Sequence, residues 1–132
     1  MTEPTRRERG MKKMAEVYAW PEVPDIPGDF FGVTAEHLFG DIWTREGLSN
    51  RDRRLLLLGV IATLGEMNVL PIQLDAALAN DELSPEDLRE ITVFLAHYVG
   101  WPRAAALNTV VEGRIAQHTG AGTTQRFPGP KQ

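Results

Sequence analysis

Residues 48–65 read LSNRDRRLLLLGVIATLG, and this stretch decides the fold class. Ser49 is a suitable N-cap, and Asp52 places a carboxylate in the first turn, where the helix dipole favours one. The apolar residues that follow are Leu55, Leu56, Leu57, Leu58, Val60, Ile61, Ala62 and Leu64. A helix that is apolar on all sides is buried on all sides. At about 17 residues, with arginines in its first turns, it is short and charged for a membrane span. We therefore expect residues 49–65 to form a buried central helix.

The composition is that of a globular domain. The chain has 132 residues, of which 42% are hydrophobic and 24% charged, and its formal net charge is −4. These values suit one domain with a core of its own. A negative net charge argues against nucleic acid as a partner, because phosphate binding needs a positive surface. The N-terminal sequence lacks the apolar segment of a secretory signal, so we expect a cytoplasmic protein without membrane association.

Helical patterns occupy most of the remaining chain, and no stretch shows the strict alternation of a half-buried strand. We predict an all-α fold of about six helices around the buried helix 49–65. The first of the other helices is expected from a cap at Thr2 or Thr5 to Tyr18, just before the Trp20–Pro21 step. The others are expected over 29–43, over 68–80 with Asn68 as its cap, over 84–99 with Ser84 as its cap and Pro85 in its first turn, and over 102–117. The expected organisation is an N-terminal helix and proline-rich loop (1–28), a helical domain (29–118) and a flexible tail (119–132).

The sequence contains no nucleophile-elbow, P-loop or paired-histidine zinc motif, so no cofactor and no metal ion are expected. Of its three histidines, His118 suits the C-terminal end of a helix. His37 forms an i, i+4 pair with Asp41, which is common on helix surfaces. His97 is expected on the face opposite the core-facing residues Leu88, Ile91, Leu95 and Tyr98. It is either a solvated or interface histidine or a functional group.

Arg54 lies on the same stripe of the central helix as Leu57, Leu58 and Ile61, which directs it along apolar surface. A buried guanidinium needs a carboxylate partner or an anionic ligand. Alternatively, a first-turn arginine extends its apolar stem along the surface and keeps its charge in water. Both interpretations remain open from the sequence. As a ligand-binding residue, Arg54 would hold a substrate carboxylate in a bidentate pair.

Three stretches together resemble the carboxymuconolactone decarboxylase family. The first, residues 39–53, contains the pattern G-x-x-W-x-R-x-G-L-S over Gly40–Ser49; the second covers 64–78; the third contains Y-x-G-W-P-x-A over Tyr98–Ala104. The resemblance spans about residues 30–116. It implies an alkyl hydroperoxidase D-like helical bundle that assembles into trimers or hexamers, with sites between subunits. It also implies a lyase of aromatic-compound catabolism, because members of this family decarboxylate 4-carboxymuconolactone.

The chain departs from the family pattern at two functional positions. The family has a glutamate in the central helix and a histidine nineteen residues later, where this chain has Arg54 and Gln73. Neither acts as a general base at neutral pH. In the sister group of thiol peroxidases, a pair of cysteines falls on Glu66 and Val69 of this chain, which contains no cysteine. Without these cysteines, the thiol peroxidase chemistry of the sister group is excluded.

The resemblance leaves a set of residues at the implied pocket. Glu66 and His97 are the candidate catalytic residues for proton transfer, and the candidate substrate-binding residues are Arg54, Gln73, Trp43 and Tyr98. This set favours a decarboxylase-type lyase acting on a small carboxylated metabolite. The alternative is a non-catalytic oligomeric scaffold or ligand-binding protein that has lost the family's glutamate and histidine.

Overall fold

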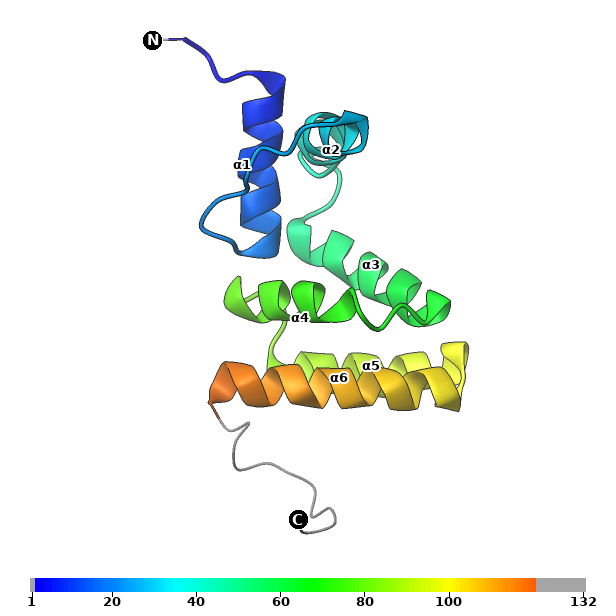
Figure 1. Cartoon of the computed structure of the whole chain (residues 1–132). Helices are drawn as coiled ribbons and strands as arrows, with labels where there is room; N and C mark the ends of the chain where they lie inside the picture. The colour runs from blue at the N-terminus through cyan, green and yellow to red at the C-terminus, as the bar shows by residue number, and fades with distance from the viewer. Residues whose placement is uncertain (1, 121–132) are drawn as a thin grey trace, which may run out of the picture. The chain divides into compact units, whose positions relative to one another are not determined.

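The computed structural model describes residues 2–120, and all secondary structure within this range is helical. The helices shown in Figure 1 are α1 (Arg6–Tyr18), α2 (Asp29–Val33), η1 (Thr34–Ile42), α3 (Asn50–Leu64), α4 (Leu70–Ala79), α5 (Pro85–Val99) and α6 (Trp101–Thr119). Because α2 continues directly into η1, the described residues contain the six predicted helical segments. The all-α prediction is confirmed. The predicted tail lies outside the described residues from position 121 onward.

The chain forms two compact units, Met1–Arg53 and Arg54–Gln132, which we call the N-terminal and C-terminal units. In the N-terminal unit, Thr5 caps α1 through a reciprocal capping box with Glu8. Helix α1 ends at Ala19, which adopts a left-handed conformation. This confirms the predicted end of the helix just before the Trp20–Pro21 step, where the residue preceding proline disfavours helical geometry.

Helix α1 packs closely on η1, a nine-residue π-helix. A Cβ atom added to Gly10 would lie 1.6 Å from the carbonyl oxygen of Ala35, so only glycine permits this approach of the two backbones. Val17 of α1 and Ala35 and Phe39 of η1 are fully buried, and the ring centroid of Phe39 lies 5.5 Å from that of Tyr18 in α1. The sequence predicted one continuous helix over 29–43. Its wider π register within that range was not predicted, because side-chain periodicity over so few turns does not distinguish the two registers.

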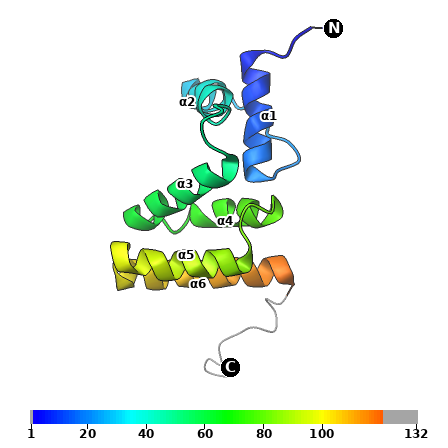
Figure 2. The same cartoon turned by 180° about the vertical axis from the view of Figure 1, so that it is seen from behind.

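In the C-terminal unit, α5 and α6 lie side by side, and α4 packs on α6 (Figures 1 and 2). Ser84 and Asp87 form a capping box at the start of α5, with Pro85 in its first turn, as predicted. Helix α4 begins at Leu70 without a side-chain cap, so the prediction that Asn68 caps it was wrong. The core of the unit consists of Leu58, Ile61, Ala62, Leu70, Leu74, Ala77, Leu78, Leu83, Leu88, Leu107, Val111 and Ile115.

Helix α3 differs from its prediction in one important respect. The hydroxyl of Ser49 accepts a hydrogen bond from the Asp52 N–H, as expected of a cap. However, Leu56, Val60 and Leu64 are 63%, 53% and 65% exposed in the single chain. The prediction that this helix is buried on every side is therefore wrong. The buried residues of the helix are Arg54, Leu58, Ile61 and Ala62, and Leu55 and Leu57 are partly buried against the same core.

Candidate functional site

Arg54 is the most deeply buried charged side chain of the described residues, with no solvent exposure. Its Nε donates to Oε1 of Glu82 at 2.8 Å, and its Nη2 donates to Oε2 of the same carboxylate at 3.2 Å. Its Nη1 donates to Oε1 of Gln73 at 2.7 Å. The guanidinium therefore holds a carboxylate in the bidentate geometry that makes such pairs strong. We call Arg54, Gln73 and Glu82 the buried polar centre.

The contacts of Arg54 decide between the two interpretations left open by the sequence, a buried guanidinium with an acidic partner and a surface arginine with its charge in water. Its side chain runs inward to an internal carboxylate and does not extend to water. The carboxylate belongs to Glu82, whose side chain is itself only 9% exposed. Sequence reasoning placed Glu82 in a connector and did not consider it further. The one available signal was the need of a buried arginine for an acidic partner.

The turn after α4 directs Glu82 toward Arg54. Asp81 has a positive φ of 54°, and the N–H of Glu82 donates to the carbonyl of Ala77 at 2.9 Å. The next residue, Leu83, is buried in the core. The chain thus reverses direction directly after the helix. Burial of Leu83 fixes the connector and keeps the Glu82 carboxylate at the guanidinium.

Gln73, predicted to bind substrate, lies nineteen residues after Arg54 and is in direct contact with it. Helix α4 presents it to the core beside Leu74 and Ala77. The two positions at which the resemblance implied a glutamate and a histidine are therefore adjacent in space. In this chain they form an arginine–amide contact.

Glu66, a predicted catalytic residue, lies exposed in the turn that follows α3. Gly65 makes this turn with a positive φ of 74°, and the N–H of Glu66 donates to the carbonyl of Ile61. Its carboxylate forms no hydrogen bond or ion pair with a residue of the described range. It is accessible to a ligand and is not part of the buried polar centre.

His97, the second predicted catalytic residue, is exposed near the end of α5. Its Nδ1 lies 2.8 Å from the carbonyl oxygen of Val93. Since a carbonyl only accepts hydrogen bonds, Nδ1 carries the proton and Nε2 is left for proton transfer. The ring lies edge-on to that of Trp101, with centroids 5.3 Å apart. The predicted position of His97, away from the core, agrees with the structure.

Tyr98 was predicted on the core face of α5, and this was wrong. It is 77% exposed, whereas Leu88, Thr92 and Ala96 are the buried residues of the helix. An apolar tyrosine ring fits the same helical spacing as a core residue, so periodicity alone misplaced it. Its ring packs on that of Phe94, with centroids 5.1 Å apart.

Tyr98 contributes to an open cleft of about 380 Å³ between α3 and α5. We call it the apolar cleft; its lining residues are Leu56, Gly59, Val60, Thr63, Leu64, Leu95, Tyr98 and Val99. Its volume is within the range of small-molecule sites. The exposed apolar residues of α3 that contradict the sequence prediction are the ones that form its wall.

Trp43, the last predicted binding residue, belongs to the N-terminal unit. It is buried there and stacks on Phe39, with ring centroids 6.0 Å apart. Its carbonyl oxygen accepts a hydrogen bond from Arg53 at 3.2 Å. Within its unit, Trp43 has the contacts of a core residue.

Between residues 2 and 120, no three histidine, aspartate or glutamate side chains are grouped so as to hold a metal ion. None of the helices in the described part of the chain combines the length and the apolar character needed to cross a membrane.

The described residues form the all-helical fold that the sequence motifs imply. Residues 28–112 match the model of the carboxymuconolactone decarboxylase family, and the chain belongs to that family. It is 25% identical over 119 residues to a 4-carboxymuconolactone decarboxylase of Acinetobacter baylyi (strain ATCC 33305 / BD413 / ADP1). The alignment covers 85% of this chain and 88% of that protein. No solved structure matches the chain significantly.

Proposed function

We propose that this chain is a carboxy-lyase that acts on a small carboxylated metabolite of the kind formed in aromatic-compound catabolism, without a cofactor, in the cytoplasm. The observation that carries the proposal is the buried guanidinium of Arg54, held in bidentate contact with a carboxylate inside the family-matched region. A carboxylated substrate presents the same group to Arg54. The decarboxylase relative supports the reaction class.

Decarboxylation breaks the bond between the carboxyl carbon and its neighbour, and carbon dioxide leaves. The electron pair remains on the neighbouring carbon until a proton is added there. Arg54 binds a carboxylate of the substrate and fixes its orientation, and Gln73 holds the guanidinium in place. Glu66 or His97 delivers the proton. Tyr98 and Trp43 remain predicted substrate-binding residues.

Substrate binding by Arg54 requires that Glu82 gives way, because Glu82 already occupies the guanidinium. The test is decarboxylation of 4-carboxymuconolactone by the purified chain, followed by ultraviolet absorbance. The double variant Arg54→Met/Glu82→Gln removes both charges together and avoids leaving one of them buried alone. We expect it to lose about ten- to a hundredfold in kcat/KM, which corresponds to the loss of a charged hydrogen bond.

The matched control is Arg89→Met/Glu112→Gln, which removes a bidentate pair of the same composition from the surface of the same unit. It is expected to leave kcat/KM unchanged. Equal activity of the Arg54 double variant and the wild type would show that Arg54 does not bind substrate. Lack of turnover by the wild type would exclude this substrate.

The proton donor is identified by Glu66→Gln and His97→Ala, with Glu90→Gln and His118→Ala as exposed controls. Loss of the group that transfers the proton is expected to lower kcat by about 10²- to 10⁴-fold. If neither variant changes kcat, the proton comes from another group and both assignments are wrong.

A specific observation favours a second candidate function, that of a non-catalytic ligand-binding or scaffold protein. The charge of Arg54 is already neutralised by Glu82, and every buried side-chain nitrogen and oxygen atom of the described residues has a hydrogen-bond partner. Such a centre is complete without substrate. Ligand-dependent thermal stabilisation by small carboxylates, without turnover, is the result expected for this candidate.

We also propose that the chain forms a homo-oligomer, a trimer or a hexamer. The support comes from the exposed apolar residues of α3 and α5, namely Leu56, Val60, Leu64, Val93, Phe94, Tyr98 and, beside them, Trp101 of α6. Contiguous apolar surface of this kind usually marks a protein interface. A second copy of the chain is the partner that the family resemblance implies.

A further inference from the structure

A second cleft, of about 360 Å³, lies entirely within the N-terminal unit and shares no residue with the buried polar centre or the apolar cleft. We call it the N-terminal cleft. One wall comes from α1 and carries Arg6 and Arg7; the other comes from α2, η1 and the residue before them. The residues of that other wall are Gly28, Asp29, Gly32, Val33, Glu36 and His37. The volume suits a small molecule.

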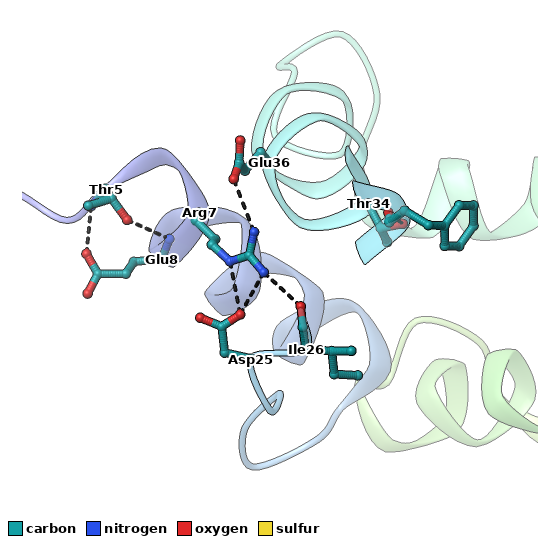
Figure 3. A network of polar contacts seen from close by, with 8 residues as sticks. Thr5, Arg7, Glu8, Asp25, Ile26, Thr34 and Glu36 are labelled. Atoms are coloured by element: carbon teal, nitrogen blue, oxygen red, sulfur yellow. Dashed lines mark hydrogen bonds and ion pairs between the residues drawn. The ribbon is translucent and has the colours of Figure 1, made fainter. Parts of the chain in front are cut away.

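Arg7 anchors the cleft and has little capacity left for a ligand. Its Nε and Nη2 donate to Oδ1 of Asp25 at 3.0 and 2.7 Å, and Nη2 also donates to the carbonyl of Ile26 at 2.9 Å (Figure 3). Its Nη1 makes a longer contact of 3.3 Å with Oε2 of Glu36. The guanidinium also lies over the ring of Phe31. Arg7 therefore ties α1 to the opposite wall.

Arg6, in contrast, has guanidinium N–H groups that can still donate hydrogen bonds to a ligand. Only its Nη2 is engaged, with Oδ2 of Asp41, and its side chain is about half exposed. The same Asp41 oxygen lies 3.0 Å from Nδ1 of His37. The hydrogen bond from Arg6 is the main cause that lowers the pKa of Asp41, and His37 contributes in the same direction. Asp41 is thus ionised at neutral pH and orients both Arg6 and His37 at one end of the cleft.

The opposite wall carries carboxylates whose oxygens can still accept hydrogen bonds. The carboxylate of Asp29 makes no hydrogen bond or ion pair with any residue of the described range. Glu36 receives only the 3.3 Å contact from Arg7. Gly28 and Gly32 contribute no side chain to this wall, and a Cβ added to Gly28 would meet nothing within 4 Å. The cleft therefore has unfilled donors on one wall and unfilled carboxylate acceptors on the other.

From this arrangement we propose that the N-terminal cleft binds a small zwitterion that carries both an ammonium and a carboxylate group, such as an amino acid. The carboxylate binds Arg6, and the ammonium binds Asp29 and Glu36. A singly charged ligand satisfies only one wall and is repelled by the charges of the other. The wall formed by α1 lies outside the family-matched residues 28–112, and no residue of the N-terminal cleft takes part in the decarboxylase proposal.

The test uses the full chain labelled with ¹⁵N and four probes observed by two-dimensional NMR. L-Alanine and 4-aminobutyrate are zwitterions of two lengths, whereas propionate and ethylamine each carry one of the two charges of alanine. We expect at least one zwitterion to bind with a Kd on the order of 1 mM and to shift the amide signals of Gly32, Glu36 and His37. We expect propionate and ethylamine to bind at least tenfold more weakly.

Variants then test which residues of the two walls bind the zwitterion. Asp29→Asn breaks no hydrogen bond of the described residues and is the safest substitution; Glu36→Gln removes only a long contact. Each is expected to weaken zwitterion binding about tenfold, as is Arg6→Gln. The controls are Glu22→Gln and Arg9→Gln, which remove exposed charges that do not line the cleft, and both should bind as the wild type does.

The proposal is overturned if neither zwitterion shifts these signals, or if propionate or ethylamine binds as tightly as the zwitterions. Unchanged affinity in Asp29→Asn and Glu36→Gln would also overturn it, because both acceptors are then dispensable. Since Arg6→Gln also removes the contact with Asp41, its circular dichroism spectrum is compared with that of the wild type. If it unfolds, the two acidic variants decide the outcome.

Discussion

The stability of the C-terminal unit depends on Arg54 and Glu82 as a pair. Removal of one partner leaves a buried charge without compensation, which typically costs about 3–5 kcal/mol. We therefore expect Arg54→Met to lower the free energy of unfolding by about this amount. The double variant Arg54→Met/Glu82→Leu is expected to recover most of the loss, because two apolar side chains need no partner. Urea denaturation of the four members of the cycle measures the coupling.

The surface pair Arg89 and Glu112 provides the comparison. It has the same residue types and the same bidentate contact, but both side chains are more than two-fifths exposed. We expect its coupling to be below about 1 kcal/mol. A similarly small coupling for Arg54 and Glu82 would mean that water reaches the buried polar centre in solution.

Arg54 and Gln73 were candidate residues from the sequence, whereas Glu82 was missed. Helical spacing placed Arg54 on the apolar stripe of its helix, with burial and surface exposure both left open, and the family resemblance pointed to Gln73. Glu82 lies in a connector, where no periodicity indicates the direction of a side chain. The prediction that Tyr98 faces the core was wrong for the opposite reason. Tyr98 has the helical spacing of a core residue, but its ring is exposed. The motif on either side of Trp43 indicated the family correctly, although the contacts of Trp43 in its own unit are those of a core residue.

At the scale of helices, the contact of α1 with η1 depends on Gly10. A Cβ at this position would meet the Ala35 carbonyl at 1.6 Å, and no rotamer change relieves a backbone clash. We expect Gly10→Ala to cost about 1–3 kcal/mol or more, as overpacked cores do. The melting temperature followed by circular dichroism measures this effect.

Gly113 is the matched control, because it also lies within a helix but a Cβ there would meet nothing within 4 Å. Gly113→Ala is expected to stabilise the chain by about 0.5–1 kcal/mol through helix propensity. Opposite signs for the two variants support the close contact of α1 and η1. If Gly10→Ala is as stable as the wild type, the two helices do not pack at this distance.

Helix ends with clear capping residues were predicted well, as at Thr5 and Ser84, because a cap is a local interaction between a side chain and the first turn. The start of α4 was predicted less well, since no side chain caps it and Asn68 offered a false signal. The π register of η1 was not predicted, because side-chain periodicity over so few turns does not distinguish a π-helix from an α-helix.

At the scale of the whole molecule, the half-exposed central helix has a consequence for assembly. The strongly apolar composition of residues 55–64 predicted burial on all sides, and the single chain buries only one of these sides. The apolar composition of a helix predicts that its sides are buried. It does not indicate whether they are buried within one chain or between chains. The unburied side, around Val60, is the surface that we propose joins the copies of the homo-oligomer.

We expect Val60→Asp to dissociate this assembly, because a carboxylate buried in an apolar interface without a partner is strongly unfavourable. Multi-angle light scattering after size-exclusion chromatography should give the mass of one chain, 14.7 kDa, for the variant and a multiple of it for the wild type. Val60 is already exposed in the single chain, so the variant should keep its helical circular dichroism spectrum. Val33→Asp, at an exposed valine of the N-terminal unit, is the control and should remain assembled. A wild-type mass of 14.7 kDa would refute the oligomer and leave the apolar cleft as a surface for a different partner.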